Sequence, residues 1–320
     1  MHIDPYIVLG SAIIGLLVGM TGAGGGALMT PMLILLFSVK PSTAISSDLV
    51  AAVVMRPIGA GVHMKAGTVN FKIVRWMVLG SVPAAFLGAY LLSLIGNAKA
   101  AENNIETYLG AALLVGAAAM ALRFVLDRLG GPRRRVVVTR VAPRPLLTLA
   151  LGVVGGVIVG MTSVGSGSLM IIGLLFIYPM LGANQLVGTD LTQAVPLTLA
   201  AALGALIFGH VELSVTGSLI IGSVPAVLIG SMLSSTVPDR YVRPVIAFVI
   251  FASGLKYIGV ATTTLGWILC ATLLACGLAW LAVSRPWTSW AAEAAPAAPD
   301  VPDADADPES ERETTSVGGG

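Results

Sequence analysis

The sequence predicts an all-α polytopic membrane protein made of two homologous halves, and three observations lead to this fold class. Hydrophobic residues make up 56% of the 320 positions and charged residues only 11%, whereas soluble domains carry about 25% charged residues. Apolar segments close to the ~20 residues that a helix needs to cross a bilayer recur along the chain. Finally, an ordered series of glycine-rich motifs occurs twice.

The apolar segments define the expected organisation of the chain. They run roughly over 5–37, 42–64, 73–95, 106–126, 145–180, 184–209, 213–236, 242–259 and 262–284. The first and the fifth are interrupted by glycines. We therefore expect a first transmembrane repeat over 1–126, a basic cytoplasmic linker over 127–144, a second repeat over 145–260, an extra C-terminal transmembrane helix over 261–285 and an acidic disordered tail over 286–320.

The internal duplication is visible as matched motifs. A shift of about 141 residues places Gly19-Met20-Thr21 on Gly160-Met161-Thr162, and Gly24 and Gly26 on two further glycines. One further residue of shift places "GSVPA" at 80–84 on the same letters at 222–226. Chance can supply one such match but not an ordered series, so the chain is an internal duplication.

The glycine-rich stretches predict a broken or re-entrant helix at the start of each half. Glycine is a poor helix former, and Gly24, Gly25 and Gly26 are consecutive, whereas helix-packing glycines recur every fourth residue. Unpaired backbone groups cost several kcal/mol in lipid, so such a break persists only in protein or beside a polar cavity. Helix N-termini at two facing breaks would suit an anion.

The distribution of basic residues predicts that the two halves are inverted repeats. If both interrupted segments turn back instead of crossing, each half has an odd number of crossings, and the basic loops 65–75 and 127–144 lie inside the cell. Arg240, Arg243 and Arg285 then lie inside as well, whereas a fully spanning arrangement places them outside.

These motifs resemble those of the TauE/SafE sulfite exporter family, also called toluene-sulfonate-uptake transporters. The resemblance rests on "GMTGAGGGALMTP", "GMTSVGSGSLM", the "VGTDL" of 187–191 and the paired "GSVPA" segments, and it covers about residues 5–260. It implies an integral protein of a bacterial inner membrane that transports a sulfur-containing anion such as sulfite, sulfoacetate or another organosulfonate.

We expect one small anion to bind at mid-membrane between the two breaks. Glycine backbone, hydroxyl groups, one amide and one guanidinium would contact it. The candidate residues are Thr21, Gly24, Gly25, Gly26, Arg56, Thr162, Ser163, Gly165, Ser166, Gly167 and Gln193. Two alternatives stay open: Arg56 could extend to the membrane interface, and the hydroxyls could pair only with freed backbone groups.

Three further residues are candidates for ion coupling. Asp48 and Asp190 are intramembrane carboxylates, which are costly and often belong to ion or proton relays. A structural role in capping the neighbouring broken helix is equally compatible with their occurrence in both halves. His63 lies seven residues after Arg56, on nearly the same helical face, and could instead be an interfacial residue.

Other function classes are less compatible with the duplication. An intramembrane serine protease could use Ser163 or Ser166 with His210, but Gly25 and Thr68 replace Ser166 and His210 in the first half. We therefore expect no enzyme, and no metal, cofactor or nucleic acid. An anion channel and a carboxylate transporter remain alternatives, and a homodimer is one arrangement that the sequence leaves open.

Overall fold

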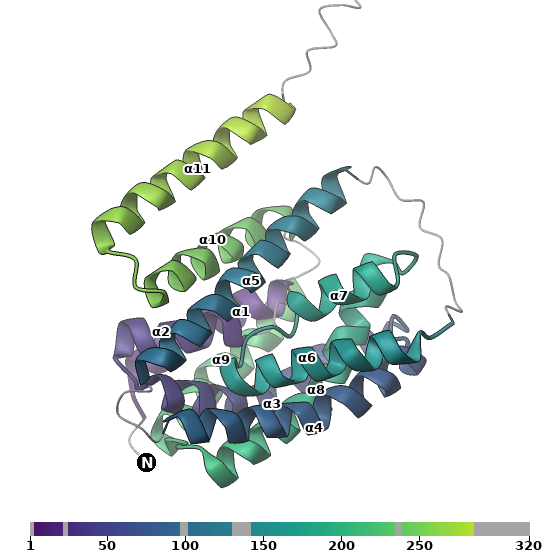
Figure 1. Ribbon diagram of the computed structural model, residues 1–320, viewed down its shortest axis with the longest axis horizontal. Helices are drawn as coiled ribbons and strands as arrows, with labels where there is room; N and C mark the ends of the chain where they lie inside the picture. The colour runs from purple at the N-terminus through teal and green to yellow at the C-terminus, as the bar shows by residue number, and fades with distance from the viewer. Residues whose placement is uncertain (1–2, 22–24, 97–101, 130–141, 234–238, 285–320) are drawn as a thin grey trace, which may run out of the picture. The chain divides into compact units, whose positions relative to one another are not determined.

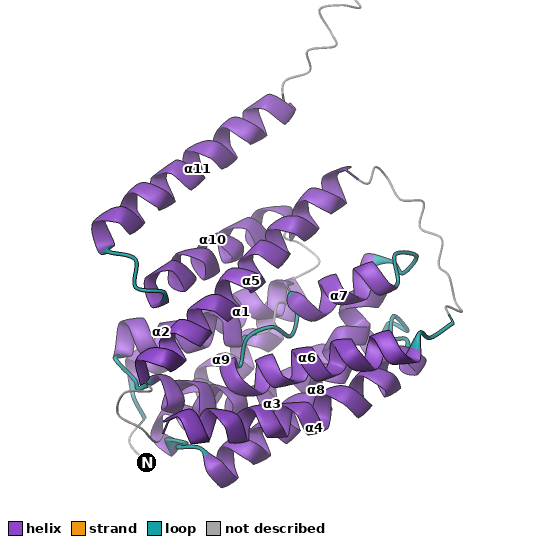
Figure 2. Ribbon diagram, viewed as in Figure 1, coloured by secondary structure: helices purple, strands orange, loops and turns teal. Residues whose placement is uncertain are grey.

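The computed structural model describes residues 3–21, 25–96, 102–129, 142–233 and 239–284, and every regular element in these ranges is an α-helix (Figures 1 and 2). The helices are α1 (Pro5–Thr21), α2 (Gly26–Phe37), α3 (Pro41–Lys65), α4 (Phe71–Gly96), α5 (Glu102–Leu129), α6 (Pro145–Thr162), α7 (Leu169–Ile177), α8 (Ala183–Phe208), α9 (Leu213–Leu233), α10 (Asp239–Tyr257) and α11 (Thr262–Ser284). The predicted all-α class is confirmed.

Six of the described helices are long and apolar enough to cross a membrane: α3, α4, α5, α6, α8 and α9. The prediction of a polytopic membrane protein is therefore confirmed. Residues up to Trp267 form one compact unit, and the chain from Ile268 onward forms a second. The expected tail and most of the expected basic linker lie outside the described residues.

Close helix pairs connect the two halves through glycine. α1 packs along α9, and α6 packs along α4. A glycine lets two helix backbones approach closely, and the glycines of one helix meet the backbone of the other. The contacts are Gly15–Ser223, Gly19–Val227, Gly156–Ser81 and Gly160–Ala85. Residue numbers rise together in each pair, so both pairs are parallel, and the second pair repeats the first with the halves exchanged.

The third helix of each half packs against its equivalent in the other half. Gly59 of α3 faces Leu191 of α8, while Gly188 of α8 faces His63 of α3, so the two helices are antiparallel. Two hydrogen bonds repeat across this pair. They are Glu212 N to Ser47 Oγ at 3.2 Å and Asn70 N to Thr189 Oγ1 at 3.1 Å, and a shift of 142 residues exchanges them.

The interrupted segment at the start of each half is a helical hairpin. Gly10 of α1 lies against Met32 and Phe37 of α2, which places the end of α2 beside the first part of α1. Gly155 of α6 lies against Met170 of α7, and Gly173 lies against Leu151. Later residues of one helix thus lie against earlier residues of the other, so both α1/α2 and α6/α7 are antiparallel hairpins. The tip of each hairpin is the end at which α1 or α6 ends, and the base is the opposite end.

Candidate functional site

The tip of the α6/α7 hairpin is a six-residue turn, 163–168, whose backbone requires glycine. Ser163 is in the left-handed region with φ 57°, and Gly165 and Gly167 have φ values of 116° and 98°. Such angles are strained for residues with a Cβ atom. Thr162 Oγ1 donates 2.6 Å to Ile158 O and accepts 3.2 Å from Val164 N, so this hydroxyl pairs with backbone at the break.

The tips of the two hairpins touch each other. Gly26, the first residue of α2, packs directly on the backbone of Ser163, and any side chain at this position would overlap the Ser163 carbonyl group. A methyl group at the neighbouring Gly25 would make only ordinary contacts with Met29 and Met55. Both glycines were expected at the site, and only Gly26 is required by this contact.

Asp48 joins the two tips. Its carboxylate is fully buried, and its Oδ2 accepts hydrogen bonds from Thr30 Oγ1 of α2 at 3.0 Å and from Ser163 Oγ at 2.7 Å. Its Oδ1 is buried without a hydrogen-bond partner. A lone unpaired oxygen on a buried carboxylate is costly.

Arg56 lies inside the protein, two turns further along α3, and is only 7% exposed. Its Nη1 donates to Ser166 Oγ in the α6/α7 turn. Its Nε and Nη2 are buried and have no hydrogen-bond partner. The guanidinium therefore points into the site and does not extend to the membrane interface.

Asp190 of α8 supplies the second buried carboxylate. Its Oδ1 accepts from Gln193 Nε2 at 3.3 Å, and it also accepts a hydrogen bond from the Gly167 backbone. Gln193 Oε1 in turn accepts from Ser81 Oγ of α4 at 3.1 Å. Asp190 Oδ2 is buried and unpaired.

These groups form a row along the helix axis. Asp48 and Arg56 are eight residues apart on α3, which is about 12 Å at 1.5 Å per residue. The α6/α7 turn follows this row, because Ser163 contacts Asp48, Ser166 contacts Arg56 and Gly167 contacts Asp190. Arg56 interacts electrostatically with both acids, more strongly with Asp190 than with Asp48. We call Asp48, Arg56 and Asp190 the charged row.

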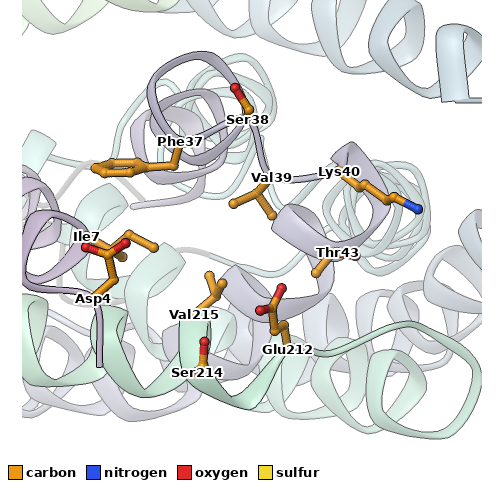
Figure 3. A pocket seen from close by; sticks show the side chains of 10 residues that line it. All are labelled: Asp4, Ile7, Phe37, Ser38, Val39, Lys40, Thr43, Glu212, Ser214 and Val215. Carbon is orange, nitrogen blue, oxygen red and sulfur yellow. The ribbon is translucent and has the colours of Figure 1, made fainter. Parts of the chain in front are cut away.

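A cavity of about 560 Å³ opens at the base of the α1/α2 hairpin (Figure 3). It is lined by Asp4, Ile7, Phe37, Ser38, Val39, Lys40, Thr43, Glu212, Ser214 and Val215. Lys40 extends away from the other lining side chains in Figure 3. The backbone N–H of Glu212, a lining residue, donates to Ser47, the residue before Asp48.

The structure brings most of the expected residues together and leaves one apart. Arg56, Asp48 and Asp190 contact the turn that contains Ser163, Gly165, Ser166 and Gly167, and Gln193 is hydrogen-bonded to Asp190. His63 lies at the end of α3, where its Nδ1 is 3.0 Å from Thr68 Oγ1. Gly24 and the side chain of Thr21 lie outside the described residues. No group of three metal-ligating side chains occurs among the residues searched in the described ranges.

Sequence reasoning did not single out two residues of the site. Thr30 follows the glycine stretch by one turn and binds Asp48. Ser81 belongs to the repeated "GSVPA" motif and binds Gln193. This motif revealed the duplication. The serine that it places inside an apolar helix is also a sequence signal for a site residue.

Comparison with known proteins identifies the family of the chain. The family model described as "Sulfite exporter TauE/SafE" matches residues 7–257. The chain is similar to the probable membrane transporter protein YjnA of Bacillus subtilis, with 40% identity over 253 residues that cover 79% of this chain and 98% of the relative. YdhB of the same organism, also named a probable membrane transporter protein, is 27% identical over 210 residues, 64% of this chain and 80% of the relative.

No solved structure matches the chain. The family match covers most of the sequence and all of the charged row, and the predicted resemblance is confirmed. The protein is an integral protein of a bacterial membrane and belongs to the TauE/SafE sulfite exporter family of membrane transporters.

Proposed function

We propose that the protein is a secondary transporter of a small sulfur-containing anion, such as sulfite, sulfoacetate or another organosulfonate. The anion binds at mid-membrane, where the tips of the two hairpins meet beside Arg56. The observation that carries this proposal is the buried guanidinium with two unpaired nitrogens, Nε and Nη2. A guanidinium edge matches two oxygens of a sulfonate, sulfite or carboxylate group.

The neighbouring groups suit an anion that must also leave. Ser166 Oγ already contacts Arg56 and could turn its hydroxyl toward a bound oxygen. The glycines of the α6/α7 turn let the substrate approach the backbone closely. Hydroxyls and backbone N–H groups hold a charge without a second fixed cation, so release remains possible.

We infer that the two halves are inverted repeats and that each opens with a glycine-broken, re-entrant hairpin. Antiparallel packing of α3 on α8 supports this, because equivalent helices related by a two-fold axis in the membrane plane run in opposite directions. The exchanged hydrogen bonds of Ser47 and Thr189 support it as well. With both hairpins turning back, three helices cross in each half: α3, α4 and α5, then α8, α9 and α10. In this arrangement α6, although long enough to cross, turns back with α7, and α10 crosses with a shorter apolar stretch.

The binding proposal is tested by calorimetry on the purified protein with sulfite, sulfoacetate, other sulfonates and dicarboxylates. Arg56→Gln should weaken binding by roughly 10- to 150-fold, since a hydrogen bond to a charged group is worth about 1.5–3 kcal/mol. Lys256→Gln is the matched control, because it removes the same charge from a side chain that is paired at the surface with Thr262. Equal binding by the parent and Arg56→Gln would contradict the proposal.

The same panel separates the substrate classes. A carboxylate fits the guanidinium edge as well as a sulfonate does, so preferential binding of dicarboxylates would assign the protein to carboxylate transport. Concentrative, saturable uptake by proteoliposomes distinguishes a transporter from an anion channel.

The topology is tested with a single cysteine at the start of α10. In the inverted arrangement Asp239 lies on the cytoplasmic side, because α9 ends and α10 begins on the side of the basic loops. Asp239→Cys, in a chain lacking the native cysteines, should resist an impermeant thiol reagent in intact cells and react in inside-out vesicles. Ready labelling in intact cells would sink the inverted arrangement.

A further inference from the structure

The charged row holds one more negative than positive group when all three side chains are ionised. Asp48 and Asp190 are both completely buried, and Arg56 is the cation between them. An anion bound at the free guanidinium nitrogens would add negative charge beside the same cation. Buried like charges within a low dielectric repel strongly. Binding of an anion therefore requires a compensating positive charge, which must also bind within the charged row.

The two acids differ in how well their charge is stabilised. Asp48 accepts hydrogen bonds from two hydroxyls, at 2.7 Å and 3.0 Å. Asp190 accepts one side-chain bond, a 3.3 Å contact from Gln193, and one backbone bond from Gly167. Its main ionic partner is Arg56, the same group that the anion would engage. A bound anion would thus offset the electrostatic attraction of Arg56 for Asp190, whereas Asp48 keeps its two hydroxyl bonds.

The other charged groups around α8 do not compensate Asp190 in the same way. Arg123 of α5 acts on it more weakly than Arg56 does. His63 of α3 contacts α8 at Gly188 and is paired with Thr68. The charged residues of α4, Lys72 and Arg75, lie near the start of that helix, and α6 and α7 contain no charged residue.

We propose that Asp190 binds one proton for each anion that Arg56 binds, so that the protein couples anion transport to proton movement. This inference rests on the proposed anion site. The proton comes from water, is held on the unpaired Oδ2 of Asp190 while the anion occupies Arg56, and returns to water when the anion leaves. No bond other than this O–H bond forms or breaks.

The contacts favour a proton over a metal cation as the compensating charge. The side chains around both carboxylates, Thr30, Ser163 and Gln193, direct O–H or N–H groups toward them. Donors that point at the acids leave few oxygen lone pairs for a sodium ion, which needs several oxygen ligands. A single proton on one unpaired carboxylate oxygen needs none.

The test is the pH dependence of sulfoacetate binding to the purified full-length protein, measured by calorimetry between pH 6 and pH 9. Sulfoacetate keeps the same charge over this range. If one proton binds with each anion, the affinity falls about tenfold per pH unit above the pKa that Asp190 has without the anion. Asp190→Asn, a neutral mimic of the protonated acid, should bind with an affinity that no longer changes with pH.

Asp48→Asn makes the same change in the other half: it removes a carboxylate that joins the two tips and so alters the affinity, but the binding that it retains should still fall as the pH rises. In proteoliposomes, an imposed pH gradient should drive sulfoacetate accumulation by the parent and not by Asp190→Asn. Sulfoacetate binding by the parent with a flat pH profile would overturn proton coupling and leave the anion site intact. A pH dependence that survives in Asp190→Asn would overturn the assignment to Asp190. If sulfite, sulfoacetate, other sulfonates and dicarboxylates all failed to bind at any pH, both proposals would be overturned.

Discussion

The bases of the two hairpins occupy equivalent positions in the duplicated chain and have different structures. At the base of α1/α2, Phe37 lines the 560 Å³ cavity. A shift of 141 residues places Tyr178 on Phe37 at the base of α6/α7. Tyr178 is only 2% exposed, and its hydroxyl lies 2.6 Å from Thr148 Oγ1 and accepts 2.8 Å from Arg144 N. One base borders a cavity, and at the other base, which we call the closed base, the equivalent aromatic ring is buried and hydrogen-bonded.

This difference shows how two equivalent hairpins of a duplicated chain can differ in access to the protein interior. The two hydrogen bonds that repeat across the halves, at Ser47 and Thr189, have the same geometry on both sides. The hairpin bases differ at this level by one hydroxyl group on an aromatic ring and by the partners of that hydroxyl. A transporter that works by alternating access needs two such bases that exchange their open and closed states.

Among substitutions that compare the two hairpins, we expect the largest effect on transport and stability from one at their tips. Gly26→Ala should abolish transport and destabilise the protein by about 1–3 kcal/mol, the usual cost of overpacking, because the new methyl group overlaps the Ser163 carbonyl. Gly25→Ala is the matched control and should transport like the parent, since a methyl group there makes ordinary contacts with Met29 and Met55. Anion uptake and the thermal unfolding midpoint check both variants.

Equal behaviour of the two alanine variants would contradict the contact between the tips. A loss confined to Gly25→Ala would instead place the substrate, and not Ser163, against that glycine.

The second tip uses glycine for backbone conformation, so a smaller effect is expected there. Gly167→Ala should cost about 1–2 kcal/mol, since its φ of 98° is strained for any residue with a Cβ atom. The shifted turn would also disturb the backbone bond to Asp190. The thermal unfolding midpoint in detergent measures the loss. If Gly167→Ala were as stable as the parent, the turn would not need its left-handed backbone.

Sequence reasoning reached the fold class because its signals are local. Hydropathy identifies membrane helices, and the glycine runs mark the two breaks without any knowledge of packing. Arg56 and Asp190 were singled out because charges are rare in such helices. The order of the charged row was beyond the sequence, since it depends on which residues of the 163–168 turn face α3 and which face α8.

The cavity and the closed base were also beyond the sequence. Phe37 and Tyr178 are equivalent by the repeat and only Tyr178 has a hydroxyl group, but the sequence alone does not say which residues this hydroxyl meets. The partners of Tyr178 are Thr148 and Arg144, which lie about 30 residues away on another helix. The matching residues of the first half are Ile7 and Ile3, which offer no side-chain hydrogen bond.

The smallest expected effect concerns the closed base itself. Tyr178→Phe gives the second base the aromatic ring of the first. It should cost about 1 kcal/mol, the usual worth of a hydrogen bond, because Thr148 Oγ1 keeps its 2.8 Å bond to Arg144 O. This loss shifts the equilibrium toward an open base by roughly fivefold.

Paired cysteines at the two equivalent positions measure this opening. In a chain without native cysteines, Ser47→Cys places a thiol beside Glu212, which lines the cavity, and Thr189→Cys places one at the equivalent position of the second half. Both parent side chains are fully buried. An impermeant thiol reagent should modify Ser47→Cys faster than Thr189→Cys when each is approached from its own side of the membrane. Adding Tyr178→Phe should speed modification at 189 and leave the rate at 47 unchanged or lower. Equal rates before the substitution would mean that the hydroxyl of Tyr178 does not close the second base.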